Sequence, residues 1–164
     1  MADVFTKEKR SEVMSRIRSR GNKNTELRLM ALMREHGITG WRRQIQLRVW
    51  KSMVDDNKRT SARHQPSTKN YQLKVRPDFI FRLQRVVIFV DGCFWHGCPR
   101  CYRRPKQNRK FWDTKVVGNQ ARDRKQSRLL KTAGWRVLRL WECALTPKNT
   151  KRTMARVRKI LEVA

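Results

Sequence analysis

Four cysteines limit the folds open to this chain, because three of them fall within nine residues and the fourth stands far along the sequence. Cys93, Cys98 and Cys101 have the spacing C-x4-C-x2-C, and Cys143 is the distant fourth. Four thiolates match the ligand demand of one tetrahedral zinc ion, and this spacing allows three of them to point inward from one loop. We therefore predict one structural zinc site, in which Cys143 ties the loop to another part of the fold.

Two other uses of these cysteines stay open. Two disulfides would need an oxidising compartment, whereas the chain starts at Met1 without a basic segment and an apolar stretch that could export it. A redox-active C-x-x-C at Cys98 and Cys101 would leave Cys93 and Cys143 without a role. We expect reduced thiols in a cytoplasmic protein, with all four bound to zinc.

The charge balance points to a polyanionic partner. The 164 residues contain 41 Lys and Arg against 13 Asp and Glu, a formal net charge of +28. A field of this size repels itself unless it meets a polyanion, so DNA association within the nucleoid is expected. With no apolar run long enough to cross a membrane, we expect no membrane partner. The length suits one domain, 1–164, which we expect to act as a monomer.

Hydrophobic periodicity and turn residues predict an α/β fold with a mixed sheet flanked by helices. A basic helix is expected at 1–21, and a polar stretch at about 49–74 lacks periodicity, which indicates a basic surface insertion. Two runs rich in β-branched and aromatic residues, 77–81 and 86–90, predict a hairpin. The other expected elements are a helix from 22 to the glycine at 37, a strand at 41–50, helices at 109–117 and 119–133, a strand at 135–141 and a closing helix that contains 154–161.

Three of the few acidic residues stand at the ends of predicted elements. Glu26 enters a helix, Asp78 opens one strand and Asp91 closes the next. In a nucleic-acid-binding protein, carboxylates gathered against the prevailing positive charge most often hold Mg²⁺, which bridges to a phosphate and activates water. Two plainer roles stay open, because Glu26 could simply favour the helix dipole and Asp78 could be a turn residue after a proline.

His96 and Asp123 complete the set of candidates for chemistry. His96 follows Asp91 by five residues and could take or deliver a proton near neutral pH. It also lies between Cys93 and Cys98, so it is a candidate zinc ligand as well. Asp123 lies in an arginine-rich run, where most aspartates pair with their arginine neighbours.

Several of these motifs together resemble the very short patch repair endonucleases. The resemblance covers nearly the whole chain, and its most specific part is the Gly-Cys-Phe-Trp-His run at 92–96. It implies a core similar to that of restriction endonucleases, one structural zinc, and Mg²⁺-dependent nicking of DNA on the 5′ side of the thymine in a T:G mismatch. Such mismatches arise when 5-methylcytosine deaminates. The residues that carry the resemblance are 14–17, 25–26, 76–79, 87–99, 111–112, 119–124, 134–138 and 141–143.

The same resemblance implies roles for the candidate residues. Asp78 would be the carboxylate that binds Mg²⁺, helped by the main-chain carbonyl of Val90. His96 would be the general base or would orient the attacking water, with Glu26 and Asp123 supporting it. The four cysteines would hold the structural zinc.

Recognition of the mismatch would fall to an aromatic wedge. By the same resemblance, Phe94, Trp95 and Trp112 would enter the DNA stack beside the mismatch, while Met14 approaches from the other groove. Aromatic faces replace lost base stacking at about 1–3 kcal/mol each, which offsets the cost of prising a base step apart. A mismatched step is already weak, which adds selectivity.

Two departures from the family pattern leave alternatives open. Asp91 stands where some members have a second histidine, so the proton relay is expected to differ and Asp91 becomes a candidate metal ligand. The stretch at about 49–74 is longer than is usual in the family, so the DNA sequence context and the mismatch preference are open to differ from those of the family. The alternatives are a homing or mobile-element type endonuclease of the same fold without mismatch specificity, and a zinc-stapled DNA-binding module without catalysis.

Overall fold

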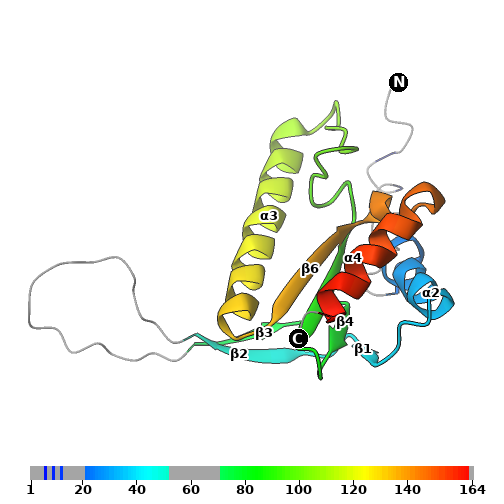
Figure 1. Cartoon of the computed structure of the whole chain (residues 1–164). Coiled ribbons are helices and arrows are strands. Elements are labelled where there is room, and N and C mark those ends of the chain that lie inside the picture. The colour runs from blue at the N-terminus through cyan, green and yellow to red at the C-terminus, as the bar shows by residue number, and fades with distance from the viewer. Residues whose placement is uncertain (1–5, 7–8, 10–11, 13–20, 52–70, 163–164) are drawn as a thin grey trace, which may run out of the picture.

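The structure is a computed structural model that describes residues 6, 9, 12, 21–51 and 71–162. Its centre is a four-stranded mixed sheet with helices on both faces (Figure 1). In chain order the elements are a π-helical turn η1 (Lys23–Leu27), α2 (Arg28–Glu35), β1 (Trp41–Arg43), β2 (Leu47–Lys51), β3 (Tyr71–Val75), β4 (Phe79–Phe81), β5 (Val86–Asp91), α3 (Arg109–Thr132), β6 (Arg136–Trp141), the short helical turns η2 (Glu142–Leu145) and η3 (Pro147–Asn149), and α4 (Thr150–Glu162).

The sheet mixes both strand directions. Its order is β1-β4-β5-β6, in which β1 pairs with β4 and β4 with β5 antiparallel, while β5 and β6 are parallel. Five of the six residues of β5 are buried, which is typical of a strand covered on both faces. The predicted mixed sheet with flanking helices is confirmed, and so is the predicted hairpin, which forms β4 and β5.

Two hydrophobic cores lie on opposite faces of the sheet, because alternate residues of a strand point to opposite sides. Phe79 and Ile88 pack with α2 and α4 on one face, and Ile80 and Phe89 pack with α3 and the β2–β3 pair on the other. Figure 1 shows α3 on one side of the sheet and α2 with α4 on the other.

The strand predicted at 41–50 is wrong as a single element. It is split into β1 and β2, which belong to different sheets, because Gln44 adopts a left-handed φ of 55° and breaks the extended chain. β2 pairs antiparallel with β3, a strand that the sequence analysis did not predict. Both ends of the surface insertion predicted at about 49–74 belong to this strand pair. Val49 is buried, and residues 71–75 form a paired strand. The centre of the insertion, 52–70, lies outside the described residues, as does most of the basic helix predicted at 1–21.

The two helices predicted at 109–117 and 119–133 are one helix, α3. Gly118 lies within it, and a glycine in a helix interior costs only about 1 kcal/mol relative to alanine, which is too little to break 24 residues of helix. The helix ends where predicted, because Gly134 takes a φ of 77° and its N–H donates to Lys131 O at 2.9 Å.

The helix expected from 22 to 37 begins as the π-helical turn η1 and continues as α2. Asn22 caps the turn, since its Oδ1 accepts a hydrogen bond from the N–H of Asn24. Gly37, with a φ of 67°, follows the end of α2 as predicted. Single π-helical turns are rare and often lie at functional sites, and this one contains Glu26.

Candidate active site and metal sites

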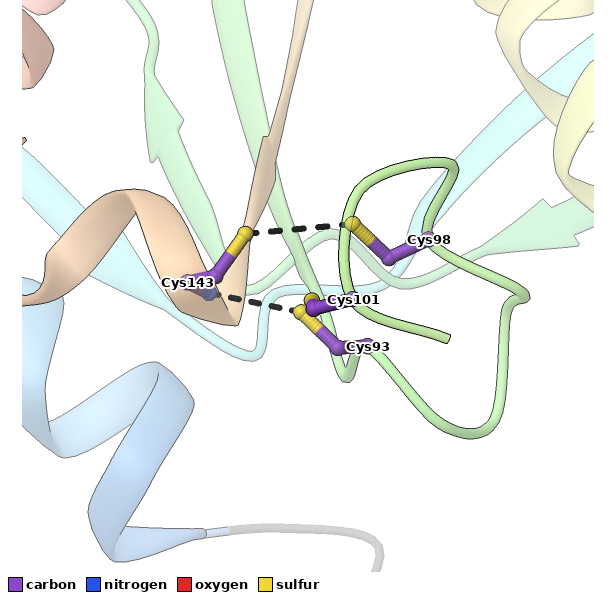
Figure 2. A group of neighbouring side chains, drawn as sticks. All are labelled: Cys93, Cys98, Cys101 and Cys143. Carbon is purple, nitrogen blue, oxygen red and sulfur yellow. Dashed lines mark hydrogen bonds between the residues drawn. The ribbon is translucent and has the colours of Figure 1, made fainter. Parts of the chain in front are cut away.

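The four cysteines come together because β5 and β6 are parallel neighbours, so the segments that follow them leave the same edge of the sheet. Cys93, Cys98 and Cys101 lie on the loop after β5, and Cys143 lies in η2 directly after β6. Their sulfur atoms all lie within 4.8 Å of one another, and the Cys98 and Cys143 sulfurs are 3.8 Å apart (Figure 2). None of the four forms a disulfide.

This arrangement fits the donor set of a tetrahedral zinc ion. Zinc–sulfur bonds of about 2.3 Å would hold pairs of sulfurs about 3.8 Å apart. Burial raises the pKa of the Cys93 thiol, so a thiolate there needs a cation to offset its charge. Burial also acts to raise the pKa of Cys98, but hydrogen bonds from the N–H groups of Arg100 and Cys101 leave that pKa below its usual value.

The cysteine loop packs closely on α3, and Gly97 makes this contact possible. Gly97 has a φ of 66°, and a Cβ there would lie 2.6 Å from Cγ1 of Val116 and 2.8 Å from Nε2 of Gln120. The amides of α3 also hold the loop, since Gln120 donates to His96 O and Asn119 donates to Trp95 O. Side chains of α3 therefore hold the backbone of the loop on one side, and Cys143 lies against the loop on the other.

Asp78 is a half-buried carboxylate at the start of β4. Its Oδ2 accepts a hydrogen bond of 2.7 Å from the N–H of Val90, and no hydrogen bond to Oδ1 is seen among the described residues. Burial raises the pKa of Asp78 to about 6, with the nearby charges of Glu26 and Asp91 adding to the increase and the Val90 N–H opposing it. A group in this position gains from a bound cation.

Glu26 is 3% exposed and is held by an ion pair. Its Oε1 lies 2.7 Å from Nε of Arg43 in β1, and its Oε2 accepts a hydrogen bond from the N–H of Gly21. Burial acts to raise the pKa of Glu26, but the hydrogen bonds from Gly21, Arg43 and Gln44 outweigh it and leave the pKa lowered. Although Glu26 lies in the first helical turn, as the plainer reading expected, a specific buried partner also holds it.

His96 lies on the cysteine loop, but its ring turns towards α3. Its Nδ1 is 2.5 Å from Oδ2 of Asp123, and 3.8 Å from Oδ1 of Asp91. The ring therefore pairs with a carboxylate and is not part of the group of four sulfurs, contrary to the alternative that it is a zinc ligand. Asp91, His96 and Asp123 form a second group whose atoms could hold a metal ion.

Arg139 was not identified from the sequence, yet it contacts both of these aspartates. Its Nε lies 2.7 Å from Oδ2 of Asp91, and one terminal nitrogen lies 3.0 Å from Oδ1 of Asp123. Asp123 thus pairs with His96 and Arg139, which are distant in the sequence. One signal in the sequence could have identified it. Arg139 alternates with Val137 and Trp141 along a predicted strand, so it shares a face with two apolar residues that are expected to be partly buried.

The aromatic residues proposed as a wedge are neighbours. Phe94 and Trp112 have ring centroids 4.9 Å apart, and Trp95 lies 5.7 Å from Trp112. All three are partly exposed. Two further rings join them, Tyr102 beside Phe94 and the 58% exposed Phe111 beside Trp112. Met14, the fourth residue predicted to contact DNA, lies outside the described residues.

An open cleft of about 820 Å³ reaches the His96–Asp123 pair from the surface. Arg124, Arg128 and Lys131 of α3 are among the residues that line it, which makes the approach to the His96–Asp123 pair basic. Within the part of the chain that the structure describes, no helix has the length and apolar character needed to span a membrane.

Comparisons with known proteins identify the family. The family model described as DNA mismatch endonuclease Vsr matches residues 61–103. The DNA mismatch endonuclease Vsr of Escherichia coli (strain K12) is 35% identical over 147 residues, which cover 88% of this chain and 76% of that protein. The Type II nicking enzyme V.NmeAIP of Neisseria meningitidis is 31% identical over 90% of this chain and 87% of its own length.

Other relatives match over a shorter stretch. The Type II nicking enzyme V.NaeI of Lentzea aerocolonigenes is 49% identical over 70 residues, or 43% of this chain. The matched part spans only 42% of V.NaeI, and 62% of the related V.XorIIP of Xanthomonas oryzae. The long match to the E. coli protein confirms the resemblance noted in the sequence, and the chain belongs to the family of the DNA mismatch endonuclease Vsr.

Proposed function

We propose that this chain is a Mg²⁺-dependent endonuclease that nicks duplex DNA on the 5′ side of the thymine in a T:G mismatch. The observation that carries the proposal is the contact of 2.5 Å between His96 Nδ1 and Asp123, at a sheet edge that also holds the Asp78 carboxylate. Membership of the Vsr family supports the reaction class. The net charge of +28 supports DNA as the partner.

In this proposal Asp78 and the main-chain carbonyl of Val90 hold the magnesium ion. The residues fit the ion, because Asp78 is a half-buried carboxylate whose pKa is raised by burial and by the charges of Glu26 and Asp91, and a divalent cation offsets that cost. When bound, the ion stabilises charge on the phosphate and lowers the pKa of a coordinated water.

His96 acts on the proton of the attacking water. Because the ionised Asp123 can only accept a hydrogen bond, the proton on the His96 ring is at Nδ1, which leaves the Nε2 lone pair as the base. Glu26, fixed by Arg43, acts as a supporting carboxylate near Asp78. The aromatic group of Phe94, Trp95 and Trp112 supplies the wedge that selects an easily opened base step.

The remaining parts of the proposal concern the protein as a whole. We take 1–164 as one endonuclease domain with a core like that of restriction endonucleases, acting as a monomer on the nucleoid in the cytoplasm. The free thiols of the cysteine group suit a reducing compartment. Zinc is the ion proposed for that group, where four thiolates leave no position open for substrate, so its role is structural.

The test is a nicking assay on two end-labelled duplexes that differ only in carrying T:G or T:A at one position. We expect a single nick 5′ of the mismatched thymine, only with added Mg²⁺ and only in the T:G duplex. Magnesium is withheld rather than chelated in the control, because a chelator would also remove zinc. Equal nicking of both duplexes would favour the endonuclease without mismatch specificity, and tight binding without any nick would favour the non-catalytic module.

A further inference from the structure

We propose that Arg139 is a positioning residue for this reaction, which decides which of two competing carboxylates holds His96. This inference rests on the proposed function for its kinetic consequence, but its structural consequence can be measured without any activity. Asp91 and Asp123 both lie near His96 Nδ1, at 3.8 Å and 2.5 Å. Arg139 contacts both carboxylates, so it sets how each is oriented.

The guanidinium of Arg139 holds Asp91 with two hydrogen bonds. Its Nε is 2.7 Å from Oδ2, and its terminal nitrogen is 2.5 Å from Oδ1, the oxygen that faces His96. The same terminal nitrogen is 3.0 Å from Oδ1 of Asp123. This leaves Oδ2 of Asp123 to accept the hydrogen bond from His96. A planar, bidentate guanidinium is suited to this task, whereas a lysine ammonium is a point charge.

The tertiary structure fixes Arg139 in this place. In the parallel pairing of β5 with β6, Arg139 is opposite Phe89, and its guanidinium lies 4.6 Å from the centre of that ring. Asp91 and Asp123 are 5% and 9% exposed, and the Arg139 side chain is 23% exposed. Two carboxylates this close and this buried repel each other unless a cation lies between them. Arg139 supplies that charge from within the chain.

The arrangement also bears on the role of Asp91. Both of its oxygens are bound by Arg139, and both oxygens of Asp123 are bound by Arg139 or His96. In this proposal the group of Asp91, His96 and Asp123 acts as a hydrogen-bonded relay completed by arginine. The role of Asp91 in the relay is to keep Arg139 in place.

The first experiment observes His96 directly. The zinc-loaded protein is labelled with ¹⁵N-histidine, and the three histidines are assigned by substitution. We expect the Nδ1–H proton of His96 to give a sharp, slowly exchanging resonance in the wild type, because it is donated to a buried carboxylate. In Arg139→Gln, Asp91 is released and competes for this proton, so the resonance broadens or disappears. A resonance unchanged in Arg139→Gln would overturn the proposal.

The second experiment separates binding from chemistry. We expect Arg139→Gln to lower the single-turnover nicking rate by roughly 10²-fold, the size of a lost proton-transfer group, and to change the DNA dissociation constant by less than about threefold. Arg139→Lys should recover part of the rate. Adding Asp91→Asn to Arg139→Gln should recover both rate and resonance, because the competing charge is gone.

The matched control is Arg136→Gln. Arg136 lies on the same strand and is also half-buried, but it donates to Gln84 O and not to the acidic pair. We expect its rate and His96 resonance to match the wild type. Melting temperature and zinc content of each variant show whether it has folded. A folded Arg139→Gln protein that nicks at the wild-type rate would refute the positioning role, whereas a wild type that nicks neither duplex would refute the proposed function alone.

Discussion

Asp78 and Glu26 are carboxylates in a strongly basic chain, and each is held by a different kind of contact. A main-chain N–H and burial surround Asp78, so its pKa is raised, whereas Glu26 has an arginine partner and its pKa is lowered. The two environments suit two tasks. Asp78 is ready to receive a cation, and Glu26 is a permanent negative charge beside it.

The first prediction is that Asp78→Asn retains DNA binding and loses nicking. The change removes a negative charge from a basic surface, so the dissociation constant for the T:G duplex should stay equal or fall. The magnesium ion loses its anchoring carboxylate, so nicking should drop by at least roughly 10³-fold. Gel-shift titration and single-turnover nicking measure the two effects. Normal cutting by this variant would remove Asp78 from the catalytic group.

A second prediction uses the lowered pKa of Glu26. Glu26→Gln should reduce the free energy of unfolding by about 1–3 kcal/mol at pH 7, because the ion pair with Arg43 is lost. Since the folded pKa lies below the unfolded value, this contribution is fully present above about pH 4.3 and is lost as pH falls through the folded pKa. Urea unfolding from pH 7 to pH 3 should therefore show the two proteins converging in acid.

The control for Glu26 is Glu35→Gln, an exposed acid on α2. Its free energy of unfolding should change by less than about 0.5 kcal/mol at every pH, as is usual for surface substitutions. If the gap between wild type and Glu26→Gln did not depend on pH, the ion pair would not be the source of the stability.

Among the elements, the cysteine loop depends on two supports, α3 and the turn after β6. The loop touches α3 through Gly97, and it reaches the turn through Cys143. Each support can be removed by one substitution. The consequences differ, since one support is steric and the other is proposed to act through a metal.

A third prediction concerns two glycines, one in the cysteine loop and one within α3, for which substitution by alanine should have opposite effects on stability. Gly97→Ala should destabilise the protein by about 1–3 kcal/mol, because its Cβ would overlap Val116 and its φ of 66° disfavours a side chain. Gly118→Ala should stabilise it by up to about 1 kcal/mol, because a Cβ there meets open space within a helix. Thermal melts of both variants test this, and equal shifts would contradict the packing of the loop.

The fourth prediction is that Cys143→Ala loses zinc and stability together. Wild-type protein should contain one zinc per chain and the variant markedly less zinc. The variant keeps only the three thiol ligands of the loop, so the metal no longer ties the loop to the turn after β6. The zinc content, the melting temperature and the nicking rate of Cys143→Ala should all fall. The control Lys148→Ala changes an exposed residue of η3 and should leave the three quantities unchanged. A stable Cys143→Ala protein, or wild type without bound zinc, would exclude a structural zinc here.

At the scale of the whole molecule, the dominant property is charge. Near the proposed site Glu26, Asp91 and Asp123 are paired with arginines or with His96, so these acids do not stand alone within the basic surface. The cleft that reaches His96 is also lined by basic residues of α3. We therefore expect the affinity for any duplex DNA to be electrostatic, and the preference for the mismatch to come from the aromatic group.

The fifth prediction follows from this division. The association constants for T:A and T:G duplexes should both fall steeply with salt, with a logarithmic slope of about −0.9 for each phosphate contacted. The ratio between the two constants should stay nearly constant, because stacking on aromatic rings does not release counterions. Fluorescence anisotropy from 50 to 300 mM KCl measures both. A ratio that collapses with salt would mean that the discrimination is itself electrostatic.

Much of the fold could be predicted because local patterns carry it. The buried strand β5 is a continuous apolar run, and the end of α3 at Gly134 follows from the conformational freedom of glycine. The break at Gln44 and the pairing of β2 with β3 could not be predicted in this way. A left-handed φ at a glutamine has no sequence signature, and strand pairing is decided by contacts between β2 and β3 rather than by residues within either strand.

The same division applies to the site. The cysteine spacing and the Gly-Cys-Phe-Trp-His run are short-range features, so the sequence alone determined the candidate zinc ligands, the family and the position of His96. Only the parallel pairing of β5 and β6 brought Cys143 to the loop and set Arg139 beside Asp91. Alternation along a strand tells which face a residue occupies, but its partner is chosen by whichever strand and helix pack there. For Arg139 the physical reason is that two carboxylates converge beside it and offset the cost of partly burying its charge.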